Sequence, residues 1–156
     1  MDDTADTAQV IIHPPVAWGL AVIAGLALNR LVRLPFLPTD LPAGWLGAMV
    51  FVLGLALGIC SIVTIVRAGS NIPTNRPTTT IVQSGPYRFT RNPIYLGMFL
   101  GQIGLAITFD DLWLLMMLVP FALVIRYGVV AREEAYLTRK FGDAHRGYCS
   151  HVRRWR

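Results

Sequence analysis

The residues that could do chemistry gather in two short blocks of the chain. The first block, "SGPYRFTRNPIYLG" (Ser84 to Gly97), holds two tyrosines and two arginines and leads into an apolar run. The second block, "AREEAYLTRKFG", places Glu133 and Glu134 after another apolar run. Aromatic faces attract cations, arginines bind carboxylates, and carboxylates pair with ammonium groups. Together the blocks could hold a zwitterionic ligand beside a lipophilic one.

Asn92 and Pro93 are typical of the start of a helix. Asparagine is a favourable N-cap, and proline suits the first helical position because its missing N–H is not needed there. A helix that begins at Pro93 leaves free backbone N–H groups, which attract anions. The pair could equally do no more than start a helix.

Four apolar segments must position these blocks. Of the 156 residues, 54% are apolar and 15% charged, and the mean hydropathy is +0.51, which favours a membrane protein. The first segment has 19 residues, which span roughly 28 Å as a helix. We therefore predict an all-α integral membrane bundle of about four transmembrane helices. The segments are Val16–Leu34, Ala43–Val66, Ile94–Phe109 and Leu112 to about Val130.

Asp110 and Asp111 separate the last two segments and predict a tight helical hairpin. Residues equally distant from the turn then lie at similar depth, which places Tyr95 level with Arg126 and brings the two blocks together. The amphipathic stretch "REEAYLTRKFGDAHRGY" predicts a further helix outside the bilayer.

Gly97 and Gly101 have the small-xxx-small spacing that lets membrane helices approach closely. Arg126 lies four residues inside the apolar end of the fourth segment. An arginine there either serves function or extends its side chain to the interface, and both interpretations stay open.

The basic residues predict which side of the membrane the blocks face. The connector Arg67–Arg91 carries four arginines, and the chain after Val130 carries seven of the 14 basic residues. The hairpin turn carries two acids and no base, so the connector and both termini should face the cytoplasm. We expect a bacterial inner-membrane protein whose active site is cytoplasmic. A basic tail beside apolar spans favours anchoring over binding to nucleic acid.

We interpret the chain as one membrane domain. Residues 1–66 form two N-terminal helices, residues 67–92 a cytoplasmic connector, and residues 93–156 the hairpin and a C-terminal cofactor-binding helix. The connector should be ordered, because it contains a β-like run from Thr78 to Val82 and is poorer in Gly and Ser than a flexible linker. The histidines lack ligand spacing, so no metal site is expected.

The two blocks resemble the isoprenylcysteine carboxyl methyltransferase family and its phospholipid methyltransferase relatives. The similar stretches are "TTTIVQSGPYRFTRNPIYLG", "REEAYLTRKFG" and "YCSHVRRW", within roughly residues 73–156. The resemblance implies a membrane enzyme that uses S-adenosyl-L-methionine, bound at the cytoplasmic ends of the last helices. It also implies that a lipophilic small molecule or lipid is the methyl acceptor.

The resemblance assigns particular residues to the cofactor. Tyr87 matches the tyrosine of a Gly-x-Tyr motif, and Glu133 matches the glutamate at the cofactor. Asn92–Tyr95 matches His-Pro-x-Tyr, with asparagine in place of the histidine. The implied cofactor contacts are Thr79, Thr80, Ile81, Val82, Tyr87, Asn92, Pro93, Ile94, Tyr95 and Glu133.

The acceptor remains open at this point. Val129 stands where eukaryotic members place a substrate-binding arginine, and Arg126 or Arg132 could replace it. A carboxylate acceptor needs an arginine to hold it, whereas an amine needs a carboxylate to take its proton. The arginines favour a carboxylate slightly, so Arg126, Arg132 and Glu134 are the candidate catalytic residues. Alternatives are a lipid-amine N-methyltransferase and a non-enzymatic lipid-binding or scaffold protein, and a second copy of the chain stays open as a partner.

Overall fold

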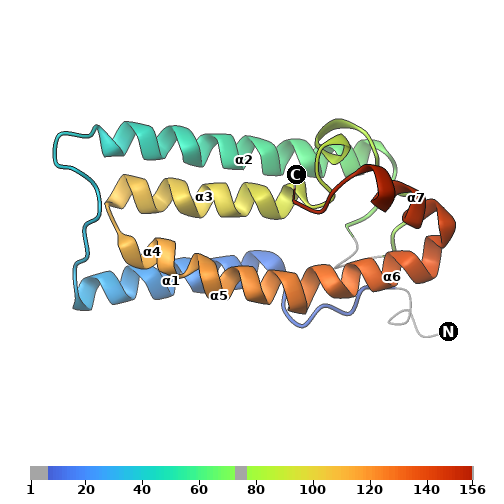
Figure 1. Cartoon of the computed structure of the whole chain (residues 1–156), viewed down its shortest axis with the longest axis horizontal. Coiled ribbons are helices and arrows are strands. Elements are labelled where there is room, and N and C mark those ends of the chain that lie inside the picture. The colour runs from blue at the N-terminus through green and yellow to red at the C-terminus, as the bar shows by residue number, and fades with distance from the viewer. Residues whose placement is uncertain (1–6, 73–76, 156) are drawn as a thin grey trace.

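The computed structural model describes residues 7–72 and 77–155, and in these residues the chain forms helices and no β-strand. This confirms the all-α prediction. The long helices lie along one another, with α2 and α3 in one layer and α1 and α4–α6 in the other (Figure 1). The elements are α1 Pro14–Leu31, α2 Ala43–Arg67, η2 Gly85–Arg88, α3 Pro93–Phe109, α4 Leu112–Met116, α5 Leu118–Leu123, η3 Val124–Val130, α6 Ala131–Phe141 and α7 Asp143–His151.

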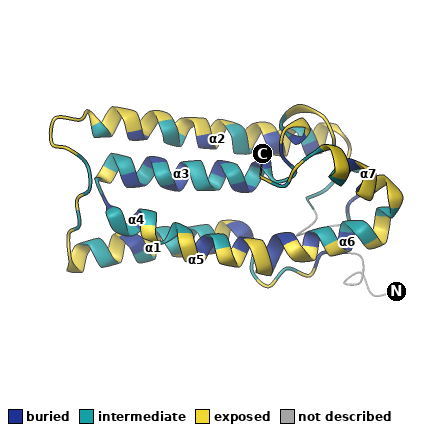
Figure 2. Cartoon of the chain, in the orientation of Figure 1, coloured by how far each residue is buried: buried dark blue, intermediate teal, exposed yellow. Residues whose placement is uncertain are grey.

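Three helices are long and apolar enough to cross a membrane by length and composition. They are α1, α2 and the 30-residue rod Leu112–Phe141, which joins α4 to α6; α3 has 17 residues and is shorter. Many large apolar side chains on α1, α2 and α5 are exposed, and Figure 2 shows these outer faces in yellow. Such faces suit lipid, so the chain is an integral membrane protein.

Some predicted boundaries were wrong. The first helix begins at Pro14 and ends at Leu31. The run Thr78–Val82 is not a strand; instead, Thr79 Oγ1 donates to the carbonyl of Gly69, in the connector just after α2, at 2.8 Å. The predicted C-terminal helix breaks at Gly142, whose φ of 53° suits glycine, and α6 and α7 lie on either side.

Glycines let α2 and α3 approach very closely. A methyl group added at Gly54 would lie 2.6 Å from the Gly97 carbonyl oxygen and 2.6 Å from the Gly101 amide nitrogen. A methyl group at Gly104 would lie 2.4 Å from the amide nitrogen of Phe51. The close approach predicted at Gly97 is therefore present, and its partners are the glycines and backbone of α2.

The hairpin turn forms at the predicted aspartates. Asp110 has a φ of 47°, and its carboxylate accepts hydrogen bonds from the amides of Phe36 at 2.8 Å and Leu37 at 2.9 Å. Asp111 caps α4 by accepting from the Trp113 amide at 2.9 Å. The turn thus also holds the loop between α1 and α2. It reverses the chain, so that the start of α3 and the α6 part of the rod lie at the same end of the bundle (Figure 1).

We predict that Gly54→Ala lowers the thermal unfolding temperature of the purified protein in detergent. The new methyl group meets backbone that cannot move aside, and overpacking of this kind costs about 1–3 kcal/mol. Gly58→Ala is the matched control on the same helix, since a Cβ there meets nothing within 4 Å. A Gly54→Ala melting temperature equal to that of the control would contradict the close packing.

Candidate active site

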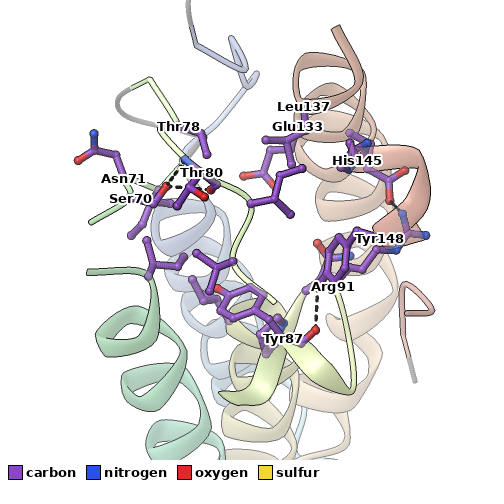
Figure 3. A pocket seen from close by; sticks show the side chains of 18 of the residues that line it. Ser70, Asn71, Thr78, Thr80, Tyr87, Arg91, Glu133, Leu137, His145 and Tyr148 are labelled. Atoms are coloured by element: carbon purple, nitrogen blue, oxygen red, sulfur yellow. Dashed lines mark hydrogen bonds and ion pairs between the residues drawn. The ribbon is translucent and has the colours of Figure 1, made fainter. Parts of the chain in front are cut away.

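A cavity opens at the end of the bundle away from the hairpin turn. It encloses about 770 Å³ of space not filled by atoms, including its open mouth. Figure 3 places Ser70, Thr78 and Thr80 of the connector on one side and Glu133, His145 and Tyr148 on the other. The full lining is Ile65, Ser70, Asn71, Ile72, Thr78, Thr80, Ile81, Val82, Tyr87, Arg91, Asn92, Pro93, Ile94, Tyr95, Glu133, Glu134, Leu137, His145 and Tyr148.

A hydrogen bond crosses the base of this cavity. The Tyr95 hydroxyl donates to Glu133 Oε1 at 2.7 Å, and both residues are more than nine-tenths buried. The hairpin geometry predicted that Tyr95 lies level with Arg126 instead. Side chains lean toward the N-terminus of their own helix, and these two helices are antiparallel. The Tyr95 side chain therefore points toward the cavity end of the bundle, and the Glu133 side chain points back toward the hairpin end. In this way two residues at different depths along the bundle meet.

A π-helical turn, η3, directly precedes α6, whose third residue is Glu133. Its i→i+5 bonding places more residues in each turn, and such turns are frequent at functional sites. One side of η3 is buried, including Val129 and Val130, while Arg126 is exposed beside the Tyr127 ring. The Gly128 carbonyl also accepts a hydrogen bond from the Ile11 amide at 3.2 Å, which ties the N-terminal segment to this turn.

Glu134 lies between two arginines at the edge of the cavity. Arg91 Nη1 lies 3.1 Å from Glu134 Oε1, and Arg154 Nε donates to the same oxygen at 2.9 Å. Arg154 Nη2 also pairs with Glu134 Oε2. The carboxylate is thus engaged by both cations.

Two buried polar atoms on residues that line the cavity have no hydrogen-bond partner among the described residues. They are the Thr78 hydroxyl and Arg91 Nε. The Thr78 amide, in contrast, donates to the Tyr136 hydroxyl at 3.0 Å. An unsatisfied buried polar group is costly, so these atoms indicate places where a ligand or water completes the bonding.

The first residues of α7 close one side of the cavity. The Tyr148 hydroxyl donates to the Tyr87 carbonyl at 2.8 Å. Burial raises the pKa of Tyr148 to about 12, so this hydroxyl keeps its proton at neutral pH. Burial, followed by the charge on Glu133, also raises the pKa of Tyr87. Burial lowers the pKa of His145, whose Nδ1 lies 3.0 Å from the Thr138 hydroxyl.

Most residues predicted for the site line the cavity. They are Thr80, Ile81, Val82, Tyr87, Asn92, Pro93, Ile94, Tyr95, Glu133 and Glu134. Asn92 directly precedes α3 as predicted, but its side chain makes no capping bond and instead donates to the Arg154 carbonyl at 3.4 Å.

The structure does not bring Thr79, Arg126 or Arg132 to this cavity. The Thr79 hydroxyl is bonded to the connector backbone, as described above. Arg132 is exposed and donates to the Gln9 carbonyl at 2.9 Å. Successive helical residues are turned by about 100°, so the residue before Glu133 points elsewhere.

Sequence reasoning missed several lining residues, chiefly Ser70, Thr78, His145 and Tyr148. His145 and Tyr148 are three residues apart in an amphipathic stretch and therefore share a helical face, which was a usable signal. The connector residues carry no periodic signal, because their positions depend on bonds to distant groups.

The family of the chain follows from comparison with known proteins. The sequence profile of the PEMT family, described as "Phospholipid methyltransferase", matches residues 42–144. This chain belongs to that family. The match covers α2, the connector, α3 and the rod up to α6, which together supply most of the cavity. The description of the family names methyl transfer to phospholipids.

A protein of Haemophilus influenzae described only as "Uncharacterized protein" is 57% identical over 35 residues. That stretch is 22% of this chain and 56% of the other protein, so the chain spans little more than half of this relative. No solved structure matches the chain significantly.

Tyr148→Phe should loosen the connector, because the Tyr87 carbonyl loses its buried donor at a cost of about 1–3 kcal/mol. Hydrogen exchange followed by mass spectrometry should show faster exchange of the η2 amides. Tyr127→Phe is the control, since Tyr127 is 63% exposed. Equal exchange in the two variants would show that the Tyr148 bond does not hold the connector.

Proposed function

We propose that this chain is a membrane methyltransferase that uses S-adenosyl-L-methionine and acts on a lipophilic acceptor. One observation carries the proposal: a buried carboxylate, Glu133, and an arginine, Arg91, line the same cavity in a member of this family. We further propose that the end of the bundle with this cavity faces the cytoplasm, because the connector and tail are rich in arginine.

The lining residues fit the proposed cofactor. Glu133 would pair with the ammonium group, and Arg91, with its unpartnered Nε, would bind the carboxylate. The Thr78 hydroxyl offers a further hydrogen bond. Tyr87 offers an aromatic face to a cation, worth about 0.5–2 kcal/mol.

When bound, the cofactor would supply a methyl group on a sulfonium sulfur. The chain's own part is positioning and exclusion of water. Tyr95 orients the Glu133 carboxylate through its hydrogen bond. The apolar side chains of Ile65, Ile94 and Leu137 line the same space, so they would help to exclude water when the cavity is filled.

We propose a carboxylate as the acceptor group. An amine must lose a proton, but Glu134 is engaged by two arginines and Glu133 accepts from Tyr95. A carboxylate is already ionised at neutral pH and needs no base. Arg126 and Arg132 do not line the cavity, so neither is proposed to hold the acceptor. The alternative is an amine on a phospholipid, since the family is described as "Phospholipid methyltransferase".

Glu133→Gln should weaken cofactor binding by about tenfold or more. The change removes the charge opposite the ammonium group, and charged hydrogen bonds contribute about 1.5–3 kcal/mol. Calorimetry on the protein in detergent measures this directly. Asp143→Asn, on the exposed part of α7, should bind as the wild type does. No binding by the folded wild-type protein would overturn the proposed function.

The acceptor can be identified from membranes that contain the protein and a methyl donor labelled on its methyl group. We expect label in a lipid extract, and mild base should release it as volatile methanol because a methyl ester has formed. Label that stays on a non-volatile product after base treatment would mean methylation of an amine and would favour the alternative. Membranes that lack the protein provide the background.

A further inference from the structure

The last described residues of the chain return to the start of α3. In Figure 1 the C-terminus lies beside this helix. The Arg153 carbonyl accepts from the Arg91 amide at 3.2 Å, and the Arg154 carbonyl accepts from the Thr90 hydroxyl at 2.7 Å. The Trp155 ring meets Phe99 edge-on, with 6.1 Å between ring centroids. We call Val152–Trp155 the C-terminal clasp; it lies beyond residues 42–144, which the family profile matches.

The clasp also brings a second cation to Glu134. Arg154 engages both carboxylate oxygens, whereas Arg91 reaches only Oε1 through Nη1. The three side chains are 16–31% exposed, so water screens them only in part. Two positive charges and one negative charge leave the cluster with one net positive charge.

This surplus charge lies at the cavity through Arg91. Its Nε is buried and has no hydrogen-bond partner among the described residues. If Arg154 were neutral, Glu134 alone would balance Arg91, and the cluster would attract anions less. With Arg154 present, the two-fold contact to Glu134 satisfies the carboxylate and the charge of Arg91 stays available.

We propose that Arg154 is a positioning residue that, by engaging Glu134, keeps Arg91 available for the carboxylate of the cavity ligand. The inference rests on the proposed function, because it takes that ligand to be S-adenosyl-L-methionine. It assigns Glu134 to charge balance rather than to proton transfer. A clasp that only held the chain end in place would make the same contacts. The experiment must therefore distinguish the effect of the Arg154 charge from the effect of holding the chain end.

Four variants separate the two roles by calorimetry with S-adenosyl-L-methionine. Arg154→Gln should weaken binding roughly tenfold, because the cluster becomes neutral. Glu134→Gln should bind no more weakly than the wild type. The double variant Arg154→Gln/Glu134→Gln has the wild-type net charge, so its affinity should return to within about threefold of the wild type. Arg139→Gln, which removes an exposed charge from the same helix as Glu134, should change little.

Decarboxylated S-adenosylmethionine provides an independent measurement. It lacks the carboxylate that Arg91 would bind, so Arg154→Gln should alter its affinity by less than about twofold. An equal loss for both ligands, or no recovery in the double variant, would overturn the inference while the proposed function stands. Absence of binding by the wild-type protein would overturn both.

Discussion

The hydrogen bond from Tyr95 to Glu133 joins the two parts of the chain that carry the candidate site, the start of α3 and the start of α6. The carboxylate is 7% exposed, and a carboxylate in such a place is costly unless donors or cations face it. The partners lie 38 positions apart on different helices, so the bond forms only if both helices return to the same end of the bundle. The hairpin at Asp110 and Asp111 meets this requirement, and its bonds to the loop after α1 add the first helix to the same arrangement.

The glycine contact between α2 and α3 determines where the connector begins. Because the backbones touch at Gly54 and Gly97, α2 runs directly along α3 and past its start. The connector therefore leaves α2 above the cavity, where Ser70 bonds to the Thr80 carbonyl at 3.2 Å and Thr78 bonds to Tyr136. The stretch Thr78–Val82, which forms no helix or strand, is thus positioned by Ser70 of the connector and by Tyr136 of α6.

Two neighbouring glutamates have different surroundings at this cavity. Glu133 faces a tyrosine hydroxyl at the base, while Glu134, turned by about 100° on the same helix, lies between Arg91 and Arg154. One part of the cavity is therefore anionic and another cationic. That separation is what a zwitterionic ligand with an ammonium and a carboxylate requires, and it is the physical basis of the function and the charge balance proposed above.

The sequence by itself determined the helical class, the hairpin at its paired aspartates and the helix start at Pro93. These follow from local chemistry: apolar length, proline geometry and the position of charged residues just outside apolar runs. The residues expected around the cavity came instead from the resemblance of two sequence blocks to a family. Only the tertiary structure decided that Glu133 meets Tyr95, that Arg126 and Arg132 point away, and that Arg154 reaches Glu134. The directions of Glu133, Arg126 and Arg132 depend on how the π turn rotates residues around the helix axis. The contact of Arg154 depends on the C-terminal residues returning to the start of α3. Neither leaves a local pattern, because the partners lie far apart in the sequence and meet only after packing.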